Sequence, residues 1–263
     1  MARSRRDFVK AGAAAVVAFA APVTLSAADP AVGLIFPPLD YPIPEDARRL
    51  YPKGVTFLSG GVGLPGGMTP EGYDEAVPRI IPAAQALAKQ GAKAISVFGS
   101  SLTFYKGARF NQDLVDRVTK ATGLPATTQS NGLVDGLKAV NAKRVAVATA
   151  YNDVVTERLR LFLQEHGFTV TSTKGLGYLR VPETGVGQDV LHKLGVDTYA
   201  ASQKADALVV SCGGLKTLDL IVPLEKDIRV PVVSSTPHGL MNAVRLVGVS
   251  PRSAGFGMVL ARA

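Results

Sequence analysis

The chain has 263 residues, 47% of them hydrophobic, so it is long and apolar enough to form one large globular domain or two small ones. It contains one cysteine, three histidines and no tryptophan, which excludes an internal disulfide, a cysteine-rich zinc site and a CxxC redox pair. The net charge of +8 comes from scattered lysines and arginines without a basic stripe, so nucleic acid is not an expected partner.

The N-terminal segment predicts export. Residues 4–10 read Ser-Arg-Arg-Asp-Phe-Val-Lys, and they precede an Ala- and Val-rich run and the small residues 26–28. Paired arginines before a short, weakly apolar stretch are typical of a twin-arginine signal peptide. The apolar run is too short to span a bilayer, so no stable membrane anchor is expected. We therefore expect residues 1–28 to direct the chain to the twin-arginine export machinery and the mature protein to be periplasmic or exported.

Beyond the signal, short β-branched runs alternate with helical patterns, which predicts an α/β fold built from parallel βαβ units. A helix is expected to begin at Thr69-Pro70, with breaks or kinks at Pro78 and Pro82. Another is expected to be capped by Asp153 and closed by Gly167. The expected strands are Val32–Phe36, Val55–Ser59, Ala94–Phe98, Ala126–Thr128, Val145–Ala150, Thr169–Ser172, Ala207–Ser211 and Val232–Ser234.

The chain also resembles itself at an offset of 113 residues. Val32–Phe36 aligns with Val145–Thr149, and Ala94–Gly99 aligns with Ala207–Cys212 at the same offset. Two separate segments that share one offset indicate duplicated halves, although buried strands also resemble one another without duplication.

A duplicated α/β chain predicts two pseudo-symmetric lobes. Each lobe would contain a short, mostly parallel sheet flanked by helices, and the active site would lie in the cleft between the lobes. The first lobe is expected to comprise residues 29–139, completed by residues 235–263, and the second to comprise residues 140–234.

The single cysteine lies where a buried strand meets two glycines. Cys212 ends the run Val209–Ser211 and precedes Gly213 and Gly214, which places it at the carboxyl edge of the sheet, where parallel α/β folds bind ligands. Backbone N–H groups there favour anions and can lower a thiol pKa, whereas a cysteine selected only for packing would be inert. We interpret Cys212 as a reactive thiol.

The matching turn in the first half is Gly99-Ser100-Ser101. Its hydroxyls and backbone N–H groups could hold a carboxylate or an enediolate. The alternative is an ordinary turn in which Ser100 caps a helix. Tyr151 follows the first strand of the second half and could offer a phenolic donor to the same cleft.

No other set of residues forms a comparable site. His166, His192 and His238 lack the spacing of metal ligands, and we expect the first two in solvent and the third in a loop. The glycine-rich run 60–67 lacks the lysine of a phosphate-binding loop and the dinucleotide-binding fingerprint, so an active-site loop is expected there. Neither a metal nor a cofactor is expected.

Through five motifs, in order along the chain, the sequence resembles the arylmalonate decarboxylase family. The members of this family are cofactor-free enzymes of the aspartate/glutamate racemase superfamily. These motifs are Gly33–Pro38, Thr69–Asp74, Gly99–Gly107, Ala148–Tyr151 and Ser211–Leu215. The resemblance extends from about residue 32 to about residue 249, and it implies two similar α/β lobes with the site between them.

The resemblance also implies roles for the matching residues. Cys212 would be the proton donor. A dioxyanion hole for the retained carboxylate would be formed by Ser100, Ser101, Tyr151 and the N–H of Gly213. Next to Gly99, the pocket for the aryl group or the departing carboxylate would be lined by Pro37, Leu64, Met68, Tyr73 and Leu102.

The presence of one cysteine favours decarboxylation over racemisation. Racemases and maleate isomerases of the superfamily resemble one another in using two cysteines, one from each half, and racemisation at carbon needs a base and an acid on opposite faces. Here Gly99 occupies the second position. Loss of carbon dioxide needs only one acid, so we predict cofactor-free decarboxylation of an α-aryl or α-alkenyl malonate through an enediolate. Enantioselective protonation by Cys212 would then give a 2-aryl carboxylic acid.

Two alternatives stay open at this point. One is a racemase or isomerase whose second acid/base is not a cysteine, with Ser100 and Tyr151 as candidates. The other is an exported protein that binds a dicarboxylate without turning it over. Both share the small-molecule dicarboxylate ligand with the predicted enzyme.

Overall fold

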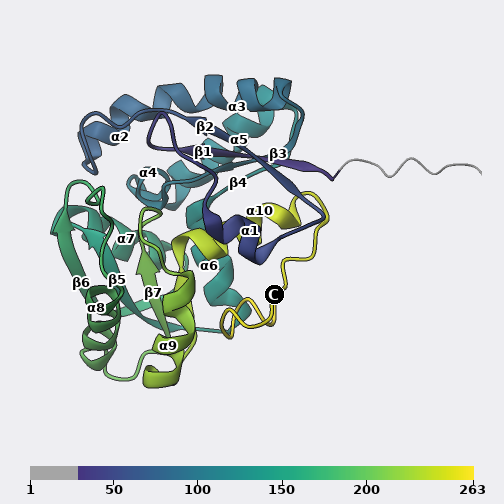
Figure 1. The fold of residues 1–263 in the computed structure, drawn as a ribbon. Coiled ribbons are helices and arrows are strands. Elements are labelled where there is room, and N and C mark those ends of the chain that lie inside the picture. Colours follow the sequence, from purple (N-terminus) through teal and green to yellow (C-terminus); the bar gives the residue numbers. More distant parts are fainter. Residues whose placement is uncertain (1–28) are drawn as a thin grey trace, which may run out of the picture.

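The computed structural model describes residues 29–263, which form two four-stranded parallel sheets, one in the upper and one in the lower half of Figure 1. The first sheet has the order β2 (Thr56–Gly61), β1 (Ala31–Phe36), β3 (Ala92–Val97), β4 (Ala126–Thr128). The second has the order β6 (Thr169–Tyr178), β5 (Arg144–Tyr151), β7 (Ala207–Ser211), β8 (Val232–Ser234). The predicted signal peptide lies outside the described residues.

The two sheets confirm the repeat. Their strand orders are the same, and β5 begins 113 residues after β1, as β6 does after β2. All pairings are parallel, so each sheet is parallel throughout rather than mostly parallel. The carboxyl ends of equivalent strands can therefore present equivalent residues to a shared cleft.

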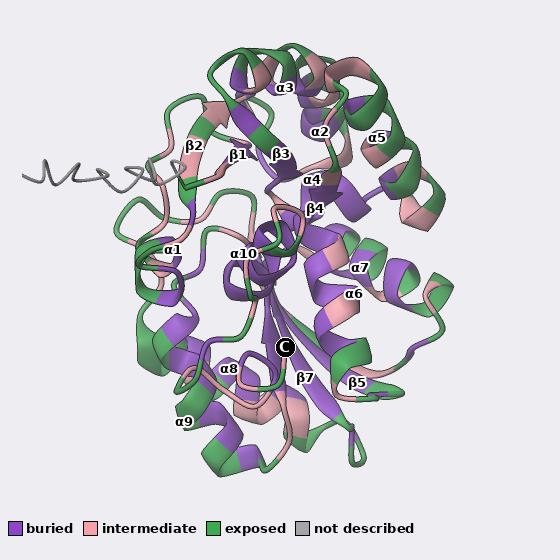
Figure 2. Cartoon of the chain, turned by 90° about the vertical axis from the view of Figure 1, so that its right-hand side faces the viewer, coloured by how far each residue is buried: buried purple, intermediate pink, exposed green. Residues whose placement is uncertain are grey.

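Helices cover the sheets and join the two halves. Among the described residues, no helix is long and apolar enough to cross a membrane. The helices are α1 (Glu45–Leu50), α2 (Pro70–Ala76), α3 (Ile80–Lys89), α4 (Ser100–Phe104), α5 (Gly107–Thr122), α6 (Gln129–Ala139), α7 (Asp153–Glu165), α8 (Gln188–Ala200), α9 (Leu218–Ile228) and α10 (Ser235–Arg245). Helices α6 and α10, which follow the last strands of the two sheets, lie against one another near the middle of the molecule (Figures 1 and 2). Because α10 also contacts β3 and β4, and α6 contacts β8, the two halves are interlocked.

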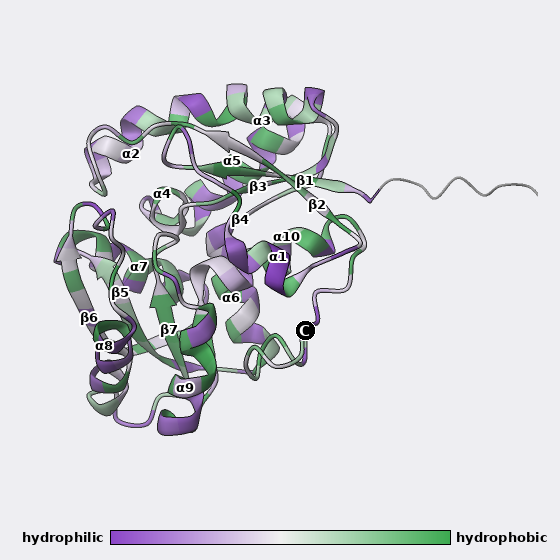
Figure 3. Ribbon diagram, in the orientation of Figure 1, coloured by the Kyte–Doolittle hydropathy of each residue, from purple (hydrophilic) through white to green (hydrophobic). Residues whose placement is uncertain are grey.

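The central strands are buried on both faces. All five residues of β7 are buried, as are seven of the eight residues of β5, and Figure 2 shows both strands as buried. Figure 3 shows the apolar character of β7, which is typical of a parallel strand covered by helices on both sides. The outer helix α5 is buried on one face, where Asn111, Leu114 and Val118 keep helical spacing, whereas the central helix α10 is buried along nearly its whole length.

The prolines after Thr69 act differently from one another. The Thr69 hydroxyl accepts a hydrogen bond from the Gly72 N–H at 3.0 Å, and Pro70 is the first residue of α2, as predicted. Pro78 lies in a 3₁₀ turn, Val77–Arg79, that separates α2 from α3. The predicted break at Pro82 is wrong, because Pro82 lies in the first turn of α3, where a missing N–H costs no helical hydrogen bond.

Two further local predictions are corrected. Helix α7 is capped by Asn152, whose side chain accepts from the Val155 N–H at 3.0 Å, while Asp153 is the first helical residue. His238 does not lie in a loop: it is fully buried in α10, and its Nδ1 lies 2.9 Å from the Ser234 carbonyl oxygen. Burial lowers the pKa of His238 to about 4. His166 and His192 are half-buried rather than solvated, and His192 lies 3.1 Å from Asp227.

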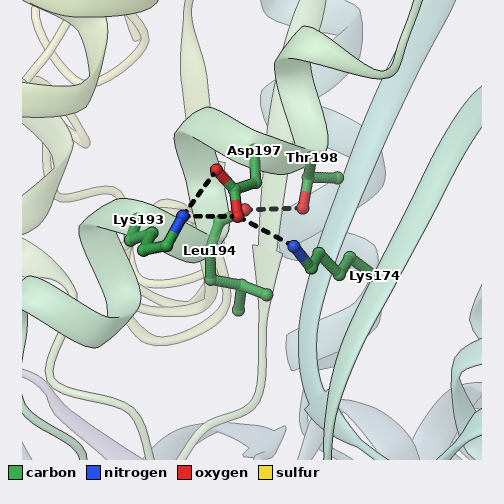
Figure 4. A network of polar contacts seen from close by, with 5 residues as sticks. All are labelled: Lys174, Lys193, Leu194, Asp197 and Thr198. Carbon is green, nitrogen blue, oxygen red and sulfur yellow. Dashed lines mark hydrogen bonds and ion pairs between the residues drawn. The ribbon is translucent and has the colours of Figure 1, made fainter.

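An ion-pair network joins the edge strand of the second sheet to its covering helix (Figure 4). Asp197 of α8 pairs with Lys174 of β6 at 2.8 Å and with Lys193 one helical turn away at 3.0 Å. In the same turn the Thr198 hydroxyl donates to the Leu194 carbonyl at 2.6 Å. The ion pairs are exposed and stabilise the lobe only weakly, whereas the Thr198 bond is buried; none of these residues lines the cavity between the two sheets.

Candidate active site

A cavity of about 630 Å³ lies where the carboxyl ends of the two sheets face one another. Most of its wall is built from residues that follow the four strands of the first sheet and β6 and β7 of the second. The cleft between the lobes is therefore where the repeat predicted it. Seven of the predicted site residues lie on its wall: Pro37, Leu64, Met68, Gly99, Ser101, Cys212 and Gly213.

Cys212 lies directly after β7, with 5% of its surface exposed. Burial raises the pKa of its thiol to about 11, and this effect is partly offset by the N–H of Gly214, the Tyr151 hydroxyl and the N–H of Leu215. The sequence indicated that backbone N–H groups could lower this pKa; in the structure burial has the larger effect. The thiol is thus protonated at neutral pH, as a proton donor must be.

Gly99 occupies the equivalent place after β3, in a backbone conformation and a space that suit glycine. Its φ is +93°, in the left-handed region that favours glycine. A Cβ at this position would lie 2.4 Å from Cγ of Pro37. Position 99 therefore contributes backbone but no side chain to the wall, and a side chain there would require Pro37 to shift.

Four buried hydroxyls form a cluster next to Cys212. The Ser100 Oγ lies 3.1 Å from the Tyr151 hydroxyl, 3.4 Å from the Ser211 Oγ and 3.0 Å from the Ser235 Oγ. The Ser211 Oγ in turn lies 3.3 Å from both Tyr151 and Ser235. The Cys212 N–H donates to the Ser235 Oγ at 3.2 Å, so the cluster is tied to the backbone of the cysteine. Ser100 is bonded into this cluster and does not cap α4.

The predicted site residues fall into two layers. Ser101 and Gly213 reach the cavity directly, whereas Ser100 and Tyr151 are fully buried one layer behind the wall. Burial raises the pKa of Tyr151 well above its ordinary value, with the nearby Cys212 as the second cause. Its phenol is therefore a hydrogen-bond donor at all ordinary pH values.

Tyr73 and Leu102 differ from the sequence prediction. Both are fully buried, and neither lines the cavity, because they lie on the inward faces of α2 and α4. The Tyr73 ring packs against Tyr105 with centroids 5.1 Å apart. Burial raises the pKa of the Tyr73 hydroxyl, and the nearby Ser101 side chain partly offsets this effect. Among the described residues this hydroxyl makes no hydrogen bond of normal geometry. These two residues support the wall from behind.

A loop from the second lobe completes the cavity and was not predicted from the sequence. Residues 179–185 line it in succession, between β6 and α8. The Leu179 carbonyl accepts from the Met68 N–H at 2.7 Å, and Arg180 donates to the Pro65 carbonyl. The glycine-rich segment of the first lobe is thus held to this loop. Leu179, Val181 and Pro182 add to the apolar part of the wall provided by Leu64 and Met68.

Gln129 is a second residue that the sequence did not reveal. It opens α6, lines the cavity and is fully buried. Its Oε1 accepts from the N–H groups of Gly99 and Ser100, each at 2.8 Å. The repeat carried a signal for it, because Gln129 directly follows β4 as Ser235 directly follows β8.

No cluster that could bind a metal appears between residues 29 and 263, where no group of three or more His, Cys, Asp or Glu residues is suitably placed. The charged groups at the cavity are single side chains at its rim: Asp40, Arg180, Glu183 and Lys216. What the wall offers a ligand is one thiol, hydroxyls and backbone N–H groups, next to an apolar surface.

Comparison with known proteins links this arrangement to one family. The family model for arylmalonate decarboxylase matches residues 32–260. Arylmalonate decarboxylase from Bordetella bronchiseptica is 44% identical over 223 residues, which is 84% of this chain and 92% of that protein. A maleate isomerase from Nocardia farcinica is 28% identical over 136 residues, covering 51% of this chain and 53% of that protein.

Solved structures agree with these sequence matches. A crystal structure of arylmalonate decarboxylase superposes with a TM-score of 0.79 at 41% identity, covering 89% of this chain and all of that one. A liganded double mutant of arylmalonate decarboxylase superposes with a TM-score of 0.85 at 42% identity and the same coverage. The maleate isomerase Iso from Pseudomonas putida S16 has a TM-score of 0.80 at 21% identity, which shows a shared fold, with 88% of this chain and 98% of that one covered.

Proposed function

Because the chain belongs to the arylmalonate decarboxylase family, we propose that this carboxy-lyase removes carbon dioxide from an α-aryl or α-alkenyl malonate and protonates the resulting enediolate on one face. The observation that supports this most strongly is the asymmetry of the cavity wall. One face carries the protonated thiol of Cys212, whereas the equivalent position in the first half, Gly99, has no side chain and so supplies no second acid or base.

The chemistry requires one acid and no base. The bond between Cα and the carbon of the departing carboxylate breaks, and its electron pair forms the enediolate of the retained carboxylate. The Cys212 proton then passes from Sγ to Cα, which leaves a thiolate that takes up a proton from water. Because the proton arrives from one side, the 2-aryl carboxylic acid forms as one enantiomer.

The retained carboxylate is assigned to the polar part of the wall. Ser101 and the N–H of Gly213 would donate directly to its oxygens. Ser100 and Tyr151, one layer behind, would supply two further donors when their hydroxyls turn from the cluster toward the ligand. Donors already oriented toward a developing oxyanion stabilise the transition state by about 3 to 4 kcal/mol each.

The departing carboxylate and the aryl group are assigned to the apolar part of the wall, formed by Pro37, Leu64 and Met68 with Leu179 and Val181. A carboxylate against these side chains loses hydration, and it regains stability only by leaving as neutral carbon dioxide. The rim carries two cations, Arg180 and Lys216, and two anions, Asp40 and Glu183, so its formal charges cancel.

Carbon dioxide release from phenylmalonate tests this function. The wild type is expected to produce phenylacetate and carbon dioxide in equal amounts. Because the pKa of Cys212 is raised to about 11, the thiol stays protonated from pH 6 to 9, and kcat should not fall across that range through its ionisation. Product formation followed by NMR from pH 6 to 11 measures this, with the decline expected only near the upper end. No carbon dioxide at any pH would contradict the proposal.

We also propose that the enzyme works in the periplasm after export. The support is the paired Arg5 and Arg6 followed by a short apolar run within residues 1–28. Cell fractionation of a host with a twin-arginine pathway is expected to place the wild type in the periplasm and the Arg5→Lys/Arg6→Lys variant in the cytoplasm. Equal distribution of the two proteins would contradict export by this route.

A further inference from the structure

The carboxamide of Gln129 is fixed by its neighbours in one orientation. Its Oε1 accepts from the N–H groups of both Gly99 and Ser100 at 2.8 Å, so the oxygen end faces the first lobe. Its Nε2 donates to the Thr236 Oγ1 at 3.2 Å, and Thr236 donates onward to the Gly213 carbonyl at 3.2 Å. The amide thus bridges the turn after β3 in one lobe and the turn after Cys212 in the other.

Among residues 29–263, the hydrogen bonds of the Gln129 amide leave one of its two N–H groups without an acceptor. A side-chain amide nitrogen carries two N–H groups, and both acceptor sites of the Gln129 oxygen are already filled. The Thr236 hydroxyl takes one N–H; across residues 29–263 the second has no acceptor. Buried amide N–H groups are normally paired, and an unpaired one next to a cavity marks a place where a ligand supplies the acceptor.

The position of this amide is next to the predicted oxyanion donors. Gln129 lines the cavity together with Ser101 and Gly213. A Cβ on Gly213 would lie 2.9 Å from the Gln129 Oε1 and 3.2 Å from its Nε2. Glycine at position 213 is therefore what allows the amide to lie directly against the backbone that carries the Gly213 N–H.

The second half of the repeat contains an equivalent hydrogen bond, but its side chain has no unpaired amide N–H. Ser235, which follows β8 as Gln129 follows β4, accepts from the Cys212 N–H at 3.2 Å. Cys212 is the repeat equivalent of Gly99. In each half, the first residue of the helix after the fourth strand therefore accepts the N–H of the residue at the active position. Only Gln129 also reaches the cavity with a free N–H.

We propose that Gln129 donates its second side-chain N–H to the retained carboxylate of the substrate, beside the N–H of Gly213, and that this bond strengthens as the carboxylate becomes an enediolate. The inference rests on the proposed function, because the acceptor is the malonate carboxylate. It adds a neutral donor from the first lobe to a site whose other direct donors are one hydroxyl and one backbone N–H.

Two substitutions separate donation to the substrate from a structural role. Gln129→Glu keeps an oxygen that can accept from Gly99 and Ser100, but as a carboxylate it has no proton to donate. At pH 8 we expect kcat/KM for phenylmalonate to fall about 10²-fold, as for loss of one oxyanion donor. Activity should recover as pH is lowered toward 5, because the protonated carboxyl regains an O–H donor. Gln129→Met, which lacks any donor, should lose about the same factor at every pH.

An exposed glutamine, Gln85, provides a matched control. Gln85→Glu makes the same chemical change on an exposed part of α3 and should leave kcat/KM and its pH profile unchanged. Wild-type kcat/KM in Gln129→Glu at pH 8 would overturn the inference, since the structural acceptor is retained there. A loss in Gln129→Glu that does not recover at low pH would overturn it as well.

Failure of the proposed function can be told apart from failure of this inference. If the wild type releases no carbon dioxide, the decarboxylase proposal fails, and the role of Gln129 is then measured by calorimetric binding of phenylmalonate. Gln129→Met should weaken that binding at least tenfold relative to wild type, and equal dissociation constants would overturn the inference.

Discussion

Replacing Cys212 by alanine is expected to lower kcat for phenylmalonate by about 10³-fold, the largest single effect in the molecule. The positioned acid contributes a factor of 10² to 10⁴ in such proton transfers, and along the described chain no second thiol exists to replace it. The Cys212 side chain is buried as well as lining the cavity, so thermal unfolding must show that the variant stays folded. Product formation by NMR and thermal unfolding together measure the effect.

The product of the residual activity of Cys212→Ala shows whether Cys212 determines the face of protonation. Water would protonate the enediolate from either face, so an α-methylated substrate should give a racemic product in place of one enantiomer. Phenylmalonate binding should stay within a few-fold of wild type, because the carboxylate donors are unchanged. A kcat within tenfold of wild type, or a product that is still a single enantiomer, would show that another group delivers the proton.

Replacing Tyr151 by phenylalanine is expected to lower kcat about 10²-fold with a smaller change in KM. Its hydroxyl lies 3.1 Å from the Ser100 Oγ and also lowers the pKa of the Cys212 thiol. Its removal would take one donor from the oxyanion side and raise the pKa of Cys212 further, which makes the thiol a weaker acid. Both losses act on the transition state, so they appear in kcat.

A matched variant makes this second prediction specific. Tyr199→Phe removes a phenolic hydroxyl from the half-buried face of α8, remote from the cavity, and should leave kcat unchanged. The two substitutions conserve volume equally well. A Tyr151→Phe enzyme with wild-type kcat would remove Tyr151 from the oxyanion site, whereas an unfolded Tyr151→Phe protein would be recognised by its thermal unfolding curve.

Much of the fold was predictable because the chain contains an internal repeat. The offset of 113 residues aligned two pairs of strands, and buried parallel strands have a composition that can be recognised from sequence. The strand ends were harder to place: β6 runs on to Tyr178, six residues beyond the predicted Ser172, because its outer half is exposed and polar and carries no buried-strand signature.

Site residues were predictable from the sequence where a reactive or hydrogen-bonding residue lies near the carboxyl end of a predicted strand. Cys212, Gly213 and Ser101 lie within four residues of the carboxyl ends of buried strands, and the structure places all three on the cavity wall. Residues 179–185 were missed because they reach the cavity through tertiary packing, and Gln129 was missed although it directly follows β4. A glutamine at the start of a helix resembles any surface glutamine until its bonds to Gly99 and Ser100 are seen.

The pairing of Cys212 with Gly99 explains why one fold supports different chemistries. Equivalent positions after β3 and β7 face one cavity, so the residues there decide whether a substrate carbon meets one acid or two groups. In this chain the crowding between Pro37 and any Cβ at position 99 works against a second group. A second acid or base at position 99 would therefore require a substitution together with a shift of the Pro37 ring.

One measurement tests the central claim most directly: decarboxylation of α-methyl-α-phenylmalonate by the wild type in deuterated buffer, with the product analysed for isotope and enantiomer. One-sided protonation by Cys212 predicts one equivalent of carbon dioxide and 2-phenylpropionate that carries a single deuterium at Cα in one enantiomer. Added single-enantiomer 2-phenylpropionate should neither racemise nor exchange its Cα hydrogen. Racemic product, or exchange and racemisation of the added acid without release of carbon dioxide, would contradict the account.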